Sequence, residues 1–306
     1  MKNIVYVLSL FATIMLAESK VGGLTHFDYT NAEEISAFNF NRQYILFSGT
    51  ASDDVKYKVI FDVGRLETND RLVAYLKKAQ IDYNASSCKV SIGMIGMNTY
   101  GVQEKNWGYR FIEKSAIDKN GFSSTADIGV GFSKAIMDDL NLNLQVVNGE
   151  GFKSPQVDKY HKISLNATYG EAKLNKNDGY NAGVVYSTES SETDPTTMVS
   201  VFGGCAGNGL RVGGEYDVLT NSDGTKKTLL SISLNYGLKD DVDVFARYDM
   251  NDPNADVEKD GDNYLIAGVV LNCGSGLSIS PNLRLTSYEN DIESNSEYKI
   301  NCQFKF

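Results

Sequence analysis

The carboxyl-terminal stretch of the chain alternates strictly between apolar or aromatic residues and polar ones. It reads Tyr298-Lys299-Ile300-Asn301-Cys302-Gln303-Phe304-Lys305-Phe306. Successive side chains of a β-strand point to opposite faces, so this stretch presents one apolar face and one polar face. The same alternation recurs in many parts of the 306-residue chain, for example over residues 125–133, 140–146 and 230–236. The sequence therefore predicts an all-β protein.

Alternating segments follow one another from end to end of the chain, separated by turn-forming residues. About 16 of them are recognisable, at residues 20–30, 36–48, 55–64, 71–84, 88–99, 123–135, 140–148, 158–170, 177–188, 196–206, 209–220, 226–237, 242–250, 262–273, 276–288 and 296–306. Short connections rich in Gly, Asn or Asp alternate with longer, more acidic ones. Bacterial outer-membrane barrels combine an even number of antiparallel strands with short turns at one end and long loops at the other. The predicted fold class is a transmembrane antiparallel β-barrel of about 16 strands.

The composition agrees with this fold. The chain has 28 Gly and 18 Tyr but only 4 Pro, and Pro removes the ladder hydrogen bonds of a sheet. Beyond residue 20 we find neither an apolar run long enough for a membrane-spanning helix nor a segment with helical periodicity. The net charge of −10 argues against a nucleic-acid partner, which would require a basic surface.

Residues 1–17 have the pattern of a secretory signal peptide. Lys2 supplies a positive charge, a short apolar run follows, and small residues stand at its end. We expect cleavage near Ala17, with Ser19 as the alternative. Residues 18–306 then form a single transmembrane barrel domain, because no linker or internal repeat divides them.

The four cysteines of the chain form no CxxC motif and no cluster with histidine. They are Cys88, Cys205, Cys273 and Cys302. We therefore expect neither a metal site nor a cofactor. Disulfide formation is open to an exported protein, and free thiols on strands are the alternative.

The longest connection, residues 100–122, follows the fifth predicted strand. Loops of this length are uncommon unless they have a function. Three aromatic residues, Trp107, Tyr109 and Phe111, stand in it between charges of both signs. We expect the aromatics to anchor the loop against the barrel wall, so that it folds inward and its charges face the channel. The alternative is an external loop that packs on its neighbours.

The two ends of the predicted barrel carry a resemblance to a known family. Residues 298–306, with Tyr298, Phe304 and Phe306, resemble the terminal assembly signal of outer-membrane barrels, which ends in an aromatic residue. Residues 40–47 resemble an early strand of bacterial outer-membrane porins, and in particular of the group related to phosphate-selective porins.

Two internal segments extend this resemblance across the chain. Residues 107–114 are similar to the start of the constricting loop of these porins, and residues 146–152 to a recurring strand-to-loop junction. The resemblance implies a passive, trimeric channel in the outer membrane of a Gram-negative bacterium. The implied partners are outer-membrane lipid and lipopolysaccharide, the barrel assembly machinery, and small polar or anionic solutes.

The candidate constriction and lumen residues carry both signs of charge. They are Arg42, Lys105, Arg110, Glu113, Lys114, Asp118, Lys119, Arg211, Arg247 and Arg284. Rings of Lys or Arg favour anions in a pore, and the predicted lumen faces are more basic than acidic, so we expect a weak anion preference. The charges of the long loop nearly balance, which argues against phosphate selectivity. The alternative is a solvated wall without selectivity.

Arg42 poses a geometric problem for this interpretation. By strict alternation it shares a face with Phe40 and Tyr44. Arg42 therefore reaches the lumen only if the strand contains a β-bulge, or if the residue lies at the rim.

Two other classes of function fit the sequence less well. A barrel enzyme of the phospholipase or protease type would need a Ser–His arrangement, but the chain has only His26 and His161 and no Gly-x-Ser-x-Gly motif. A soluble exported all-β binding protein conflicts with the terminal Phe306 and with the number of strands. We therefore expect no enzymatic activity.

Overall fold

The computed structural model describes residues 19–65, 71–290 and 292–306. The predicted signal peptide lies outside these residues, apart from the alternative cleavage position at Ser19. Within them, sixteen strands are formed: β1 (Ser19–Ala32), β2 (Ser36–Ser52), β3 (Val55–Arg65), β4 (Leu72–Asn84), β5 (Lys89–Gly96), β6 (Ala126–Ala135), β7 (Leu140–Val147), β8 (Lys162–Gly170), β9 (Gly179–Glu189), β10 (Thr196–Gly207), β11 (Leu210–Thr220), β12 (Lys226–Lys239), β13 (Val242–Asp252), β14 (Asp262–Gly274), β15 (Leu277–Tyr288) and β16 (Asn295–Lys305).

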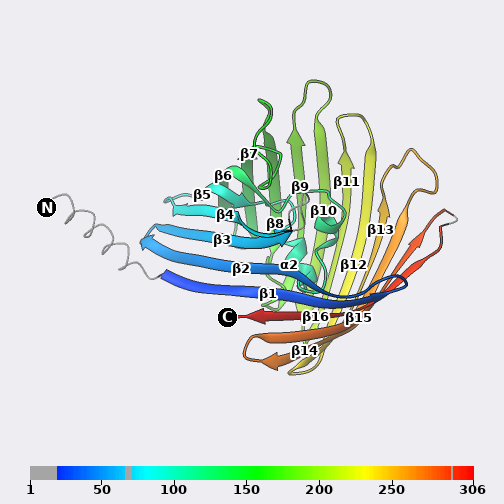
Figure 1. The fold of residues 1–306 in the computed structure, drawn as a ribbon. Helices are drawn as coiled ribbons and strands as arrows, with labels where there is room; N and C mark the ends of the chain where they lie inside the picture. The colour runs from blue at the N-terminus through cyan, green and yellow to red at the C-terminus, as the bar shows by residue number, and fades with distance from the viewer. Residues whose placement is uncertain (1–18, 66–70, 291) are drawn as a thin grey trace.

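The strands close into a single antiparallel barrel in which each strand pairs with its neighbours in sequence (Figure 1). The ring is closed by β1 and β16, where Thr25 lies opposite Phe304. Main-chain hydrogen bonds of 2.9 and 3.1 Å between Gly23 and Phe306 extend this closure to the last residue. Closure gives each of the sixteen described strands a hydrogen-bonded neighbour on both sides, as a structure surrounded by lipid requires. The predicted all-β barrel of about 16 antiparallel strands is confirmed.

The terminal stretch has the two faces that its alternation predicts. Ile300 and Phe304 are 47% and 43% exposed on the outside of the barrel, whereas Asn301 and Gln303 are 2% and 7% exposed on the inside. The other strands repeat this pattern, with apolar side chains such as Ile232 outside and polar ones such as Ser233 inside. An apolar exterior around a polar interior is what a barrel in a membrane needs.

Most predicted strand boundaries agree closely with the structure, and the largest differences are at β2 and β8. β2 continues to Ser52, and β8 begins at Lys162, not at residue 158. The side chain of Asp158 accepts a hydrogen bond of 2.8 Å from the amide of Tyr160. This local turn competes with strand pairing, and so the strand starts later than the alternation predicts.

Two short helices interrupt the segment between β5 and β6. They are α2 (Gln103–Trp107) and α3 (Ala116–Lys119). The expectation that the chain contains no helix was wrong at this place. Helices of five and four residues are too short to show a periodic pattern in sequence. No helix among the described residues is long and apolar enough to cross a membrane.

The two faces of β4 give a direct test of this arrangement. Leu76 is 37% exposed on the lipid face, and Gln80 of the same strand bonds to Asp82 on the lumen face. We expect Leu76→Arg to lower the free energy of unfolding by about 2–4 kcal/mol if it lies near the bilayer midplane. The control, Gln80→Arg, places the same charge in water and beside a carboxylate. Denaturant titrations in lipid vesicles would measure both, and equal losses would contradict the assignment of faces.

Candidate functional site

Residues 97–125, here called the inner segment, join β5 to β6 and pack against the inside of the barrel (Figure 1). Trp107 and Tyr109 lie with their ring centres 5.7 and 5.6 Å from that of Phe245 on β13. Phe111 follows at 6.4 Å from Tyr109, with the two rings perpendicular. Trp107 is 3% exposed, and its indole nitrogen donates to the carbonyl oxygen of Glu113 at 2.9 Å. The three aromatics thus cover the inner wall at β13.

Three arginines on alternate strands hold the inner segment by its main chain. They are Arg211 on β11, Arg247 on β13 and Arg284 on β15. Arg211 donates to the carbonyl oxygens of Asn106 and Trp107, both at 3.1 Å. Arg247 donates to that of Lys114 and Arg284 to that of Ile112, both at 2.6 Å. Hydrogen bonds from a charged donor are stronger than neutral ones, so the three together fix the path of the inner segment.

The charges of two of these arginines are also engaged. Arg247 is 2% exposed, pairs with Asp249 at 2.9 Å and lies 4.8 Å from the centre of the Trp107 ring. Arg284 is 6% exposed and pairs with Glu113 at 2.8 Å. Both arginines are expected from the sequence to add positive charge to the channel wall. The structure differs, because Asp249 and Glu113 compensate their charges, although Arg284 does border a lumen cavity of about 330 Å³.

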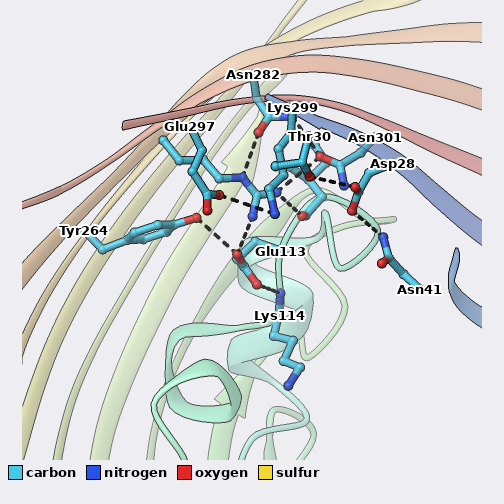
Figure 2. A network of polar contacts seen from close by, with 12 residues as sticks. Asp28, Thr30, Asn41, Glu113, Lys114, Tyr264, Asn282, Glu297, Lys299 and Asn301 are labelled. Atoms are coloured by element: carbon cyan, nitrogen blue, oxygen red, sulfur yellow. Dashed lines mark hydrogen bonds and ion pairs between the residues drawn. The ribbon is translucent and has the colours of Figure 1, made fainter. Parts of the chain in front are cut away.

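Glu113 is the centre of the polar network shown in Figure 2. One oxygen of its carboxylate accepts hydrogen bonds from Arg284 at 2.8 Å and from the hydroxyl of Tyr264 at 3.1 Å. The other accepts from the main-chain nitrogen of Lys114 at 2.9 Å. Burial alone would raise the pKa of Glu113, but the nearby Arg284 and Arg247 outweigh it, so that its pKa lies below the ordinary value.

Another part of the lumen wall is formed by β1, β2, β3 and β4, and there the structure contains the bulge that Arg42 requires. His26 pairs with Arg42 and Phe27 with Phe40, so Asn41 is an extra residue in β2. Phe40 therefore points outward, where its ring lies 5.5 Å from that of Phe27. Arg42 points inward, with its Nε 3.7 Å from a carboxylate oxygen of Asp62. The bulge explains why strict alternation assigns Arg42 to the wrong face.

A second bulge brings Lys77 to the lumen, whereas strict alternation assigns this lysine to the lipid face. Ile60 pairs with Lys78 and Phe61 with Leu76, so Lys77 is the extra residue in β4. The Lys77 ammonium lies 4.3 Å from the centre of the Phe152 ring and 3.4 Å from the hydroxyl of Thr125. Two consecutive lysines in the middle of a membrane strand were the available indication, because a charge on the lipid face is destabilising.

Arg42 and Arg110 mark where the open passage runs. Both border three lumen cavities of about 240, 330 and 370 Å³. Arg42 belongs to the wall and Arg110 to the inner segment, so the passage lies between them. Arg110 bonds to Glu104 and, at 2.8 Å, to Asp118, so that its charge is balanced within the inner segment.

The remaining predicted charges of the inner segment lie in different surroundings. Lys114 is exposed and borders two of the three cavities. Lys105 borders the third, and burial together with Lys173 lowers its pKa. Lys119 lies 4.0 Å from the centre of the Tyr264 ring, close to the wall. Of these three, Lys114 is the one most open to channel water.

The predicted assembly residues lie on the outer surface at the end of the chain. Tyr298, Phe304 and Phe306 are 62%, 43% and 60% exposed. The rings of Phe304 and Phe306 stack with centres 6.0 Å apart. Their role as an assembly signal stays a prediction.

Comparison with known proteins gives matches only among solved structures. No protein-family model matches the chain, and no curated protein does. OmpF of Salmonella typhi, in a complex with daunomycin, superposes with a TM-score of 0.71 at 12% identity, over 94% of this chain and 97% of that one. The anion-selective porin of Comamonas acidovorans gives 0.68 at 9% identity, over 95% and 100%. The trimer form of OmpT, an outer membrane protein of Vibrio cholerae, gives 0.70 at 11% identity, over 95% and 99%.

At these identities the likeness concerns the fold. The chain has the fold of porins from the outer membrane of Gram-negative bacteria. Its apolar exterior agrees with a position in that membrane. None of these three neighbours is described as phosphate-selective, and the resemblance to that group stays a prediction.

Breaking the ion pair between Arg284 and Glu113 should lower the stability of the folded barrel. We expect Arg284→Met to destabilise the folded barrel by about 3–5 kcal/mol, because it leaves a buried carboxylate without its counter-charge. The double variant Arg284→Met with Glu113→Gln removes both charges and is expected to recover most of this loss. Unfolding titrations in detergent would compare the two, with Lys105→Met as a control elsewhere in the inner segment. Equal stability of the single and double variants would contradict the pairing.

The lowered pKa of Glu113 sets the pH range in which the inner segment stays fixed. A carboxyl whose pKa is lower in the folded state stabilises that state above its unfolded pKa of about 4.3, and the contribution disappears as the pH falls through the folded value. We expect the open-channel current noise to be constant from about pH 7 to pH 5 and to rise below about pH 4. Glu113→Gln should be noisy already at neutral pH. A wild-type rise near pH 6 would refute this account.

Proposed function

We propose that the protein is an outer-membrane porin through which small polar solutes and ions diffuse passively, with a weak preference for anions. One observation carries the proposal. Beside the passage, the charges of Arg110, Arg247 and Arg284 are compensated by carboxylates, but those of two lysines are not. In the described part of the chain, no carboxylate lies within ion-pair distance of Lys77 or Lys114.

The acidic groups of the inner segment are already occupied. Glu104 and Asp118 bond to Arg110, and Glu113 bonds to Arg284. Arg42 keeps only a long contact of 3.7 Å with Asp62. The passage therefore has a positive potential although the whole protein carries −10, and such a potential raises the local concentration of anions.

The proposal includes the assembly of the channel. We infer a homotrimer, since a trimer form is recorded for the OmpT neighbour of similar fold. Lipid and lipopolysaccharide are the expected partners of the apolar exterior. The barrel assembly machinery is the expected partner of the terminal aromatic residues. No enzymatic step belongs to this function.

Reversal potentials in a salt gradient test the proposed selectivity. The wild-type channel should prefer chloride over potassium. In Lys77→Gln combined with Lys114→Gln, the permeability ratio of anion to cation should fall by about two- to fourfold, as expected from two charges a few ångströms from the ion in water.

A matched control separates local charge from total charge. Lys134→Gln combined with Lys239→Gln removes the same charge from exposed positions on β6 and β12. This control should leave the permeability ratio unchanged. A cation-selective wild-type channel, or an equal response of both double variants, would refute the proposal.

A further inference from the structure

The lumen cavity of about 240 Å³ has features that passage of simple ions does not require. It lies between β2, β4, the inner segment and the loop at residues 148–161 that follows β7. Its volume is below that of pockets that enclose drug-sized molecules, so it suits a solute with a single ring.

Positive charge converges on this cavity from four parts of the chain. Five cationic side chains border it, namely Arg42, Lys77, Arg110, Lys114 and Lys153. Two acidic residues also border it. Asp118 bonds to Arg110 at 2.8 Å and, with Glu104, balances its charge, and Glu150 accepts a hydrogen bond from the amide of Val157 at 3.2 Å. The four other cationic side chains on the border outnumber Glu150. An anion entering the cavity therefore meets an excess of cationic groups.

One wall of the cavity is aromatic. The rings of Tyr75 and Phe152 stack with centres 6.2 Å apart and planes inclined by 24°. The Lys77 ammonium lies 4.3 Å from the centre of the Phe152 ring. A flat aromatic solute can therefore contact rings by stacking and ammonium groups through its π face.

This aromatic wall is held in place by a buried carboxylate. Asp127 is 1% exposed, and one of its oxygens accepts hydrogen bonds from the amides of Gly149 and Gly151 at 2.7 and 3.3 Å. Both glycines have positive φ angles, 133° and 77°, a backbone conformation that favours glycine. The amide of Phe152 then donates to the carbonyl oxygen of Ala126 at 2.9 Å. The loop is thus fixed to β6 directly before the residues that line the cavity.

We propose that this cavity is a binding site for aromatic carboxylates of one ring, which occupy it during their passage through the channel. The carboxylate lies among the cationic groups at Arg42 and Lys114, and the ring lies against Phe152 and Tyr75. Inorganic anions contact only the cationic groups of the cavity, and uncharged sugars have no charge to pair with them and no aromatic ring to stack on Phe152 and Tyr75. An aromatic anion is therefore the solute that matches both features. The inference rests on the proposed porin function and specifies its solute class.

Current block in single channels tests this site. Benzoate added to wild-type channels in a planar bilayer should produce short, concentration-dependent closures. Cyclohexanecarboxylate has the same charge and a similar size but no π system, and it should need about a tenfold higher concentration for half-block. Phe152→Leu should raise the half-blocking concentration of benzoate about tenfold and bring it near that of the saturated acid. Phe132→Leu, on the lipid face of β6, is the matched control, and benzoate should block it at the same concentration as the wild-type channel.

The outcomes separate the site from the porin itself. Equal potency of the two acids, or no block by benzoate in a channel that still prefers chloride, overturns the binding site and leaves the proposed porin in place. A channel without anion preference in the salt gradient refutes the proposed function, whatever benzoate does. Stronger block by benzoate that is lost in Phe152→Leu and kept in Phe132→Leu supports both.

Discussion

The structure depends first on the need of every main-chain amide and carbonyl group for a hydrogen-bond partner where water is absent. In a bilayer, sheets meet this need only by closing, because an open edge would leave a row of unpaired groups in lipid. Here the pairing of β1 with β16 closes the ring and extends to the final residue. Closure in turn creates an interior that lipid cannot reach, and that interior is available for polar side chains.

The inner segment makes this interior asymmetric. Its aromatic residues and its arginine contacts bind it to the wall formed by β11, β13 and β15, so water remains mainly beside β1, β2 and β4. Charges on the two sides consequently have different roles. Arg247 and Arg284 are nearly buried and paired with carboxylates, whereas Arg42 and Lys77 border the lumen cavities without a close carboxylate partner. A count of positive charges over the lumen faces therefore overstates the charge that a passing ion meets.

Much of the fold could be predicted because alternation is a local property of the chain. It correctly assigns Ile300 to the outer face and Asn301 to the inner face, and it predicts all sixteen strands. It fails where one extra residue interrupts the pairing, so Lys77 was missed, while Arg42 was placed only on condition of a bulge.

The contacts between the inner segment and the barrel wall could not be predicted from the alternation of the strands. The contact of Arg284 with Ile112 joins residues 172 positions apart, and nothing in the local pattern of either strand or loop indicates it. The composition of the long loop indicates its aromatic residues as candidate anchors. It did not allow its charges to be divided into compensated ones, such as that of Arg110, and free ones, such as that of Lys114.

The hydrogen bonds from the wall arginines to main-chain carbonyl oxygens have an evolutionary consequence. Every amino acid carries such an oxygen, so this part of the attachment does not depend on which side chains the inner segment displays. Residues that face the water can therefore be exchanged one codon at a time while the loop keeps its place. The lining of the proposed passage can therefore change without a new scaffold, and the same freedom is open to an engineer who wishes to alter it.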